Sequence, residues 1–306
     1  MPTPKPSQKN LLIAFDAFGT LFTPHAPIGT QYGEIARKHG ICKDVSDDEI
    51  MNSFKKAFKL NAKERPNYGK EVGMDPTAWW SSIITQTFTP FLPSPAHPLP
   101  ARLVPALLAR FASRSGYTLY PDVVPLFASL RALRNAAAGR RIVTAVVTNS
   151  DDRVAGILRS FGLRVGHVPY QLGGLVAEQG EGWADNDVDF VLTSYDCGCE
   201  KPQRGIFDAA VEVAGARFGG GGGGGGGGGE GWDTVYVGDE VDKDVVGAEG
   251  AGWDAAFLVN REGVVEKEGD GVVVVRRNDL GGQGEEEVRV LRDLRNLSGY
   301  VGGANG

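Results

Sequence analysis

The chain has 306 residues, of which 42% are hydrophobic and 23% are charged, as expected for a globular protein with one large domain or two ordinary ones. The formal net charge is −6, and no run of lysine or arginine is long enough to follow a phosphate backbone, which disfavours a nucleic-acid partner. No apolar stretch approaches the roughly 18 residues that span a bilayer, and the polar N-terminus has no signal-peptide core. The sequence therefore predicts an intracellular protein, cytoplasmic or nuclear, with no membrane partner.

Five apolar, β-rich runs recur along the chain, and amphipathic, helix-like segments lie between them. The runs cover residues 11–15, 142–147, 188–192, 234–237 and 255–259. Near-continuous apolar strands that alternate with helices are typical of a parallel sheet covered on both faces. The predicted fold class is therefore α/β, with a Rossmann-like, doubly wound core. A further strand at 272–275 and a helix at 285–294 are predicted near the end of the chain.

The interval between residues 25 and 118 has a different pattern, with helical periodicity, clustered aromatic residues and several prolines. Ser46 and Glu49 form a capping-box pattern that predicts the start of a helix. Residues at helical spacing predict the buried face of another helix: Trp80, Ile84 and Phe88. We expect a helical cap over 25–118, inserted into a discontinuous core of residues 1–24 and 119–306.

Two low-complexity segments interrupt the predicted core. An uninterrupted glycine tract at 219–229 predicts a disordered loop over 219–230, because glycine loses the most entropy on ordering. Glycine matches inside that tract imply no dinucleotide site. A second insertion, rich in glycine and acidic residues, is predicted at 173–186.

Three cysteines, Cys42, Cys197 and Cys199, suit a reducing compartment better than a disulfide framework. Cys197 and Cys199 have the spacing of half a metal site. No second cysteine pair and no cluster of histidines completes such a site in the sequence, so both are predicted to be ordinary thiols.

Polar residues follow four of the predicted strands at the points where the strands end. In an open parallel sheet, ligands bind beyond the carboxyl ends of the strands, where the strand order reverses. Residues far apart in the sequence are therefore predicted to meet at one edge of the sheet. The residues at these four ends are Asp16, Thr148 with Asn149, Thr193 with Ser194, and Gly238 with Asp239.

The residue types at this edge suggest a covalent mechanism. Asp16 is followed by Gly19, which allows a sharp turn and a close approach to a ligand. A carboxylate held there can attack phosphorus or an activated carbon. The ammonium of Lys201 can keep Asp16 ionised and neutralise an anionic transition state, and Thr148 can donate a hydrogen bond to a substrate oxygen.

Three aspartates follow the fourth run, at Asp239, Asp242 and Asp244. Their oxygens suit magnesium. The alternative interpretation is an acidic loop that begins a helix. The predicted presence of Asp16 and Lys201 at the same edge of the sheet favours the metal site.

Four motifs in order resemble those of the haloacid dehalogenase superfamily. They are DAFGTL at 16–21, VVTNS at 146–150, EKP at 200–202 and VGDEVDKDVVGA at 237–248. Segments of the predicted cap, including YGEIARKHG at 32–40, look like those of the haloacid dehalogenase-like hydrolase domain-containing protein 3 group. The resemblance implies a Rossmann-like core with an inserted helical cap, a small phosphorylated substrate and magnesium as cofactor.

The resemblance also implies the catalytic roles. Asp16 is the expected nucleophile, Thr148 the donor to a phosphate oxygen and Lys201 the charge partner. Three neighbours in the first two motifs are expected to bind substrate: Gly19, Thr20 and Asn149.

The implied metal site contains Asp16, the carbonyl oxygen of Phe18 and Asp239, with Asp244 in or beside the coordination shell. Phe18 is a departure from the pattern, because phosphatases of this superfamily usually carry an aspartate there that protonates the leaving group. Losing a general acid typically costs about 10²–10⁴ in rate. The carbonyl oxygen is unaffected by this substitution.

Phe18 leaves three functions open. The first is a magnesium-dependent hydrolase of a small phosphate ester or anhydride, weakened or specialised by Phe18. The second is a 2-haloacid dehalogenase-like enzyme, whose halide needs no proton; Arg37 is the candidate halide ligand, but such enzymes work without metal and lack the Gly-Asp of the fourth motif. The third is a binding or regulatory protein with negligible catalysis.

Overall fold

The computed structural model describes residues 9–94, 96–137, 140–166, 168, 170–171, 174–175, 185–219, 231–266, 271–280 and 286–302. The chain forms two compact units. Unit 1 consists of Met1–Phe22, Leu119–Asn149 and Leu163–Gly306, and unit 2 of Thr23–Thr118 and Ser150–Gly162. Among the described helices, none combines the length and apolar character needed to cross a membrane.

Unit 1 is built on a seven-stranded sheet in the order β10-β11-β9-β8-β1-β4-β7. All neighbouring strands pair in parallel except β10 and β11. The chain moves outward from β1 through β4 to β7 and then returns to β8 on the other side of β1, so the strand order reverses between β1 and β8. The strands are β1 (Asn10–Phe15), β4 (Ile142–Thr148), β7 (Phe190–Thr193), β8 (Trp232–Gly238), β9 (Ala255–Val259), β10 (Val272–Arg276) and β11 (Glu287–Leu291).

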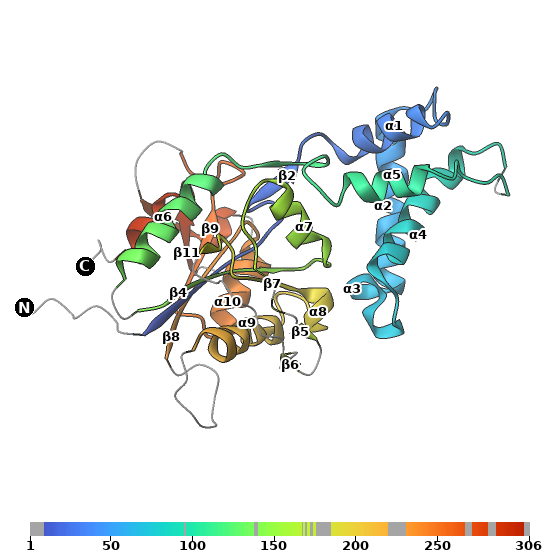
Figure 1. The fold of residues 1–306 in the computed structure, drawn as a ribbon. Helices are drawn as coiled ribbons and strands as arrows, with labels where there is room; N and C mark the ends of the chain where they lie inside the picture. Colours follow the sequence, from blue (N-terminus) through green and yellow to red (C-terminus); the bar gives the residue numbers. More distant parts are fainter. Residues whose placement is uncertain are drawn as a thin grey trace, which may run out of the picture. The chain divides into compact units, whose positions relative to one another are not determined.

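Helices cover both faces of this sheet, which explains why its central strands are almost wholly apolar. On one face Phe207 of α9 packs edge-on against Tyr236 of β8, with ring centroids 5.2 Å apart. On the other face Phe15 of β1 packs against Phe127 of α6, at 5.7 Å. Figure 1 shows α6 on one side of the sheet and α9 and α10 on the other. The helices are α6 (Val123–Ala136), α8 (Ser194–Cys197), α9 (Arg204–Phe218), α10 (Gly247–Gly250) and α11 (Asn296–Val301). The predicted doubly wound α/β fold is confirmed.

The helix predicted at 285–294 is wrong. The segment forms β11, in which Val288 and Val290 are buried while Glu287 and Arg289 are exposed. This alternation has the two-residue period of a strand, and β11 pairs with β9 and β10. The predicted strand at 272–275 is confirmed as β10.

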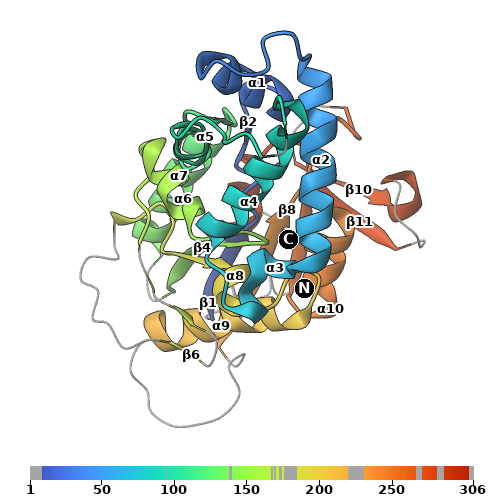
Figure 2. The same cartoon turned by 90° about the vertical axis from the view of Figure 1, so that its right-hand side faces the viewer.

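Unit 2 is mainly helical. The capping box predicted at its longest helix is present, because Ser46 Oγ accepts from the backbone of Glu49 at 3.2 Å and Glu49 Oε2 accepts from the backbone of Ser46 at 3.0 Å. Helices α2 and α4 run side by side (Figure 2). The helices of unit 2 are α1 (Ile28–Lys38), α2 (Asp47–Glu64), α3 (Pro66–Gly69), α4 (Pro76–Phe88), α5 (Leu103–Arg110) and α7 (Arg153–Ser160).

The predicted buried face of α4 needs one correction. Ile84 and Phe88 are buried, but Trp79 is more fully buried than its neighbour Trp80. The indole of Trp80 instead donates a 2.8 Å hydrogen bond to the carboxylate of Asp151.

The predicted cap and core limits stay a prediction. Unit 2 also contains Ser150–Gly162, which the predicted limits place in the core. Of the predicted loop at 219–230, Gly219 is the C-cap of α9, and residues 220–230 lie outside the described part. Residues 173 and 176–184 of the second predicted insertion also lie outside it.

Candidate active site

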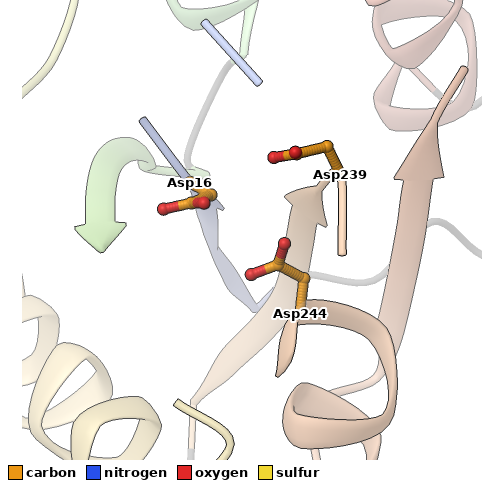
Figure 3. A group of neighbouring side chains, drawn as sticks. All are labelled: Asp16, Asp239 and Asp244. Carbon is orange, nitrogen blue, oxygen red and sulfur yellow. The ribbon is translucent and has the colours of Figure 1, made fainter. Parts of the chain in front are cut away.

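The strand order brings the predicted site residues to one edge of the sheet. Strand β1 lies between β4 and β8, so Asp16 is flanked by Thr148 at the end of β4 and Asp239 just after β8. This is the edge at which the strand order reverses. Figure 3 shows the side chains of Asp16, Asp239 and Asp244 as one group of neighbours at this edge.

Lys201 is the buried cation of the site. Its Nζ lies 2.9 Å from Asp16 Oδ1 and 2.6 Å from Asp244 Oδ1, and its side chain is only 2% exposed. It also donates a 2.9 Å hydrogen bond to the hydroxyl of Tyr236. Burial alone would lower the pKa of Lys201, but the negative charge of Asp16, the Tyr236 hydroxyl and Asp244 together hold it well above its usual value. Lys201 therefore stays protonated at neutral pH.

The carboxylates of Asp16, Asp239 and Asp244 each place one oxygen within 4.8 Å of the others. Three carboxylates against one ammonium leave two negative charges uncompensated (−3 + 1 = −2) when all are ionised. Asp16 Oδ1 is buried and makes no hydrogen bond with any described residue, although it lies near the Lys201 ammonium. Burial, followed by the charge of Asp16, raises the pKa of Asp239 to about 7. A hard divalent cation fits this group, because it prefers carboxylate oxygens as ligands and would neutralise the excess negative charge.

Two glycines allow this close packing of carboxylates. Gly19 has φ +77°, and a Cβ on it would lie 2.0 Å from Asp239 Oδ2. A Cβ on Gly238 would lie 2.1 Å from Asp244 Cγ. Larger residues at either position would push a carboxylate out of the site, so the DAFGTL and VGD motifs require glycine for steric reasons.

Thr20 and Asn149 bind other site residues. Thr20 Oγ1 donates a 2.7 Å hydrogen bond to Asp239 Oδ1. The side-chain amide of Asn149 clamps the backbone of Lys201 with two hydrogen bonds. Its Oδ1 accepts from Lys201 N at 2.7 Å, and its Nδ2 donates to Lys201 O at 3.0 Å. These contacts give both side chains a positioning role, and their predicted contact with substrate stays a prediction.

The residue at the usual general-acid position offers no proton. The ring of Phe18 packs edge-on against Phe22, with centroids 4.7 Å apart. Three expected roles stay predictions: the Phe18 carbonyl as a metal ligand, Gly19 as a substrate-binding residue and Thr148 as the donor to a phosphate oxygen. Thr148 is buried at the end of β4.

Three polar residues named in the sequence analysis do other work. Asp242 is 69% exposed and pairs with Arg277 at 2.6 Å, so it does not join the carboxylate group. Thr193 caps α8 by accepting from the backbone of Asp196 at 3.1 Å. Arg37, the candidate halide ligand, pairs with Asp47 at 2.7 Å within unit 2.

Two residues in this region are not among those predicted from the sequence: Tyr236 and Arg261. The hydroxyl of Tyr236 links Lys201 to the carbonyl oxygen of Val147, to which it donates at 2.6 Å. Arg261 donates to the carbonyl oxygen of Thr20 at 2.6 Å and makes a two-pronged ion pair with Asp122. The strand-end rule could have found Arg261, because it follows β9 closely. Tyr236 is a polar group in an otherwise apolar strand.

This chain is similar to known proteins along most of its length. A family model described as haloacid dehalogenase-like hydrolase matches residues 11–252. The chain belongs to this hydrolase family. An uncharacterized hydrolase of Schizosaccharomyces pombe is 29% identical over 82% of this chain and 91% of its own length. The haloacid dehalogenase-like hydrolase domain-containing protein 3 of Bos taurus is 29% identical over 81% of each chain. The resemblance inferred from the four motifs is confirmed.

Solved structures of this family share the fold. A 2-haloacid dehalogenase from Pseudomonas syringae superposes with a TM-score of 0.54 at 16% identity, covering 95% of this chain and 98% of that one. A phosphatase of the family from Thermococcus onnurineus gives 0.50 at 22% identity, covering 96% and 98%. These likenesses support the Rossmann-like fold and do not choose between the two chemistries.

Proposed function

We propose that this hydrolase is a magnesium-dependent phosphatase that acts on a small phosphate ester or anhydride through an aspartyl-phosphate on Asp16. The observation that carries the proposal is the group of Asp16, Asp239 and Asp244 beside the Lys201 ammonium. The first and third carboxylates are buried and Asp239 is partly buried, and the excess of two negative charges over this ammonium matches a divalent cation. The phosphatase among the fold relatives is consistent with this chemistry.

In the proposed reaction a carboxylate oxygen of Asp16 attacks phosphorus, a P–O bond forms to Asp16, and the bond to the leaving group breaks. Lys201 keeps Asp16 ionised, and Asn149 fixes the backbone that carries Lys201. Thr148 is the proposed donor to a phosphate oxygen. Water then attacks the aspartyl-phosphate at phosphorus, which releases phosphate and restores the carboxylate.

Asp16, Asp239 and the carbonyl oxygen of Phe18 would hold magnesium, with Asp244 in or beside the shell. When bound, the ion would neutralise charge on the transferred phosphoryl group. Thr20 keeps Asp239 oriented through its 2.7 Å hydrogen bond.

Phe18 sets the expected substrate range. Because its side chain cannot protonate a leaving group, good leaving groups such as activated phenols or anhydrides should react, while alkyl phosphates should react about 10²–10⁴ times more slowly. An aspartate at position 18 would also activate the water that attacks the aspartyl-phosphate in the second step, and Phe18 cannot do so. We therefore expect the aspartyl-phosphate to accumulate.

We further propose that residues 25–118 form a helical cap that selects the substrate, and that the protein acts inside the cell.

The dehalogenase alternative is favoured by Phe18 alone. The pairing of Arg37 with Asp47 and the retained carboxylate group speak against it. A binding protein with negligible catalysis is the remaining alternative.

The test compares the wild type with Asp16→Asn on an activated aryl phosphate in magnesium. The phosphatase proposal expects phosphate release from the wild type but not from Asp16→Asn, loss of that release in chelator, and a large gain in release from Phe18→Asp. Halide release from a 2-haloacid that persists in chelator would instead support the dehalogenase. Equal, background rates in all three proteins, with no magnesium-induced thermal shift, would indicate a binding protein.

A further inference from the structure

Two cysteines, Cys197 and Cys199, precede the catalytic lysine of the proposed site by four and two residues. Cys197 ends α8, Gly198 turns the chain with φ +78°, and Cys199 precedes Lys201 by two residues. The two sulfur atoms lie 3.0 Å apart. A covalent S–S bond is about 2.03–2.05 Å long, so roughly 1 Å separates this pair from bonding distance.

The two thiols have different surroundings. Cys197 is 6% exposed and belongs to the same buried hydrophobic cluster as Ile206 and Phe207 of α9, whereas Cys199 is partly exposed. Burial, followed by the hydrogen bond with Cys199, raises the pKa of Cys197 to about 12. Cys199 is therefore the sulfur that a dissolved oxidant reaches first, and Cys197 is placed to resolve the product.

We propose that Cys197 and Cys199 are a modification site that closes to a reversible disulfide when a small peroxide oxidises Cys199. The sulfur of Cys199 attacks one peroxide oxygen, the O–O bond breaks, and Cys199 becomes a sulfenic acid while hydroxide leaves. The sulfur of Cys197 then attacks the Cys199 sulfur, the S–O bond breaks, and the departing hydroxide carries the thiol proton away as water. In total two thiols lose two electrons and two protons, and hydrogen peroxide becomes two water molecules.

The disulfide acts on Lys201 through the chain. Because Cys197 is fixed in the core, the closing movement of about 1 Å falls on Cys199 and the segment behind it. That segment is held by Gln203, whose side chain accepts from Glu200 N at 3.0 Å, and by Asn149, which accepts from Lys201 N at 2.7 Å. Oxidation therefore strains the Asn149 clamp and moves the ammonium relative to Asp16.

The disulfide itself is tested on the purified full chain, reduced or treated with hydrogen peroxide. We expect titratable thiols to fall by two, the peptide that contains Cys197 and Cys199 to lose two hydrogen atoms in mass, and a dithiol reductant to restore both. Cys42→Ser should leave this response intact, and Cys199→Ser should abolish it. Three titratable thiols after oxidation, or a sulfinic acid on Cys199 beside a free Cys197, would overturn the proposal.

The effect on Lys201 is read by hydrogen exchange, which needs no activity. Oxidation should speed exchange in the peptide containing Lys201 in the wild type and leave it unchanged in Cys199→Ser. Unchanged exchange in a fully oxidised wild type would refute the coupling. We also expect oxidation to lower the rate of phosphate release about tenfold, since a misplacement of 1 Å can lower a rate by roughly 10²-fold. This expectation rests on the proposed phosphatase function. A chain that forms the disulfide and speeds exchange but never releases phosphate would refute that function and leave the modification site standing.

Discussion

Thr20 Oγ1 donates a 2.7 Å hydrogen bond to Asp239 Oδ1, although their positions in the sequence differ by 219. Both residues follow a strand, and the two strands, β1 and β8, are neighbours. The bond fixes one carboxylate of the proposed metal site from a residue that is itself completely buried. Orientation of a ligand by such a partner is typically worth about 10–100-fold in metal affinity.

Thr20→Val should therefore raise the magnesium concentration that half-activates phosphate release by about 10–100-fold. It should also lower the free energy of unfolding by about 1–3 kcal/mol, because it leaves a partly buried acceptor unpaired. Thr20→Ser, which keeps the hydroxyl, should stay near the wild type in both measurements. Identical magnesium activation in Thr20→Val and Thr20→Ser would show that the bond does not orient a ligand.

Gly19→Ala should be far more damaging than Gly40→Ala. Both glycines have positive φ, +77° and +87°, so each substitution carries a left-handed penalty of about 1–2 kcal/mol. A Cβ on Gly40 meets nothing within 4 Å, whereas one on Gly19 would meet the Asp239 carboxylate. Denaturant unfolding should show the shared penalty in both variants, and phosphate release should collapse in Gly19→Ala alone. Full activity in Gly19→Ala would contradict the steric account.

Lys201→Met should lower the free energy of unfolding by about 3–5 kcal/mol, because it removes the cation beside two buried carboxylates. Lys243→Met is the matched control, since Lys243 pairs with Glu240 at 2.8 Å but is exposed. Its loss should change stability by less than about 1 kcal/mol. The difference is measured by denaturant titration at neutral pH. Comparable losses in the two variants would mean that the Lys201 contacts contribute no more than a surface pair.

In the presence of a chelator, the free energy of unfolding of the metal-free protein should fall as pH rises from about 4 to about 7. In this window the folded chain keeps Asp239 protonated, because its pKa is raised to about 7, while the unfolded chain has lost that proton. Folding therefore requires proton uptake, and the penalty grows until Asp239 ionises in the folded state as well. Thermal unfolding in chelator should show this decline in the wild type and less of it in Asp239→Asn. A decline of equal size in the variant would assign it to another group.

Much of the fold could be predicted because the central strands are buried on both faces. Residues 11–15 and 255–259 form strands nearly as predicted, since a fully apolar run of that length has few alternatives in a parallel sheet. Segment 287–291 alternates polar and apolar residues with the period of a strand, but the sequence does not show that it pairs with β10 and β9. Its partners are a property of the fold and not of the local sequence.

The candidate site was predictable in its members but not in its contacts. The end of a strand indicates where Asp16 and Asp239 lie. It does not indicate that Asn149 clamps the backbone of Lys201, because that contact depends on a loop 52 residues away. Asp242 and Asp244 looked equivalent in sequence, yet residues two apart in a helical segment face different sides, and only Asp244 reaches Lys201.

The proposed mechanism is tested most directly by an acid quench of the wild type mixed with magnesium and excess activated aryl phosphate, followed by peptide mass analysis. We predict one phosphoryl group on the peptide containing Asp16, which accumulates because Phe18 cannot activate the second step, and none in Asp16→Asn. Steady phosphate release without any phosphoryl group on Asp16, or release undiminished in Asp16→Asn, would contradict the mechanism.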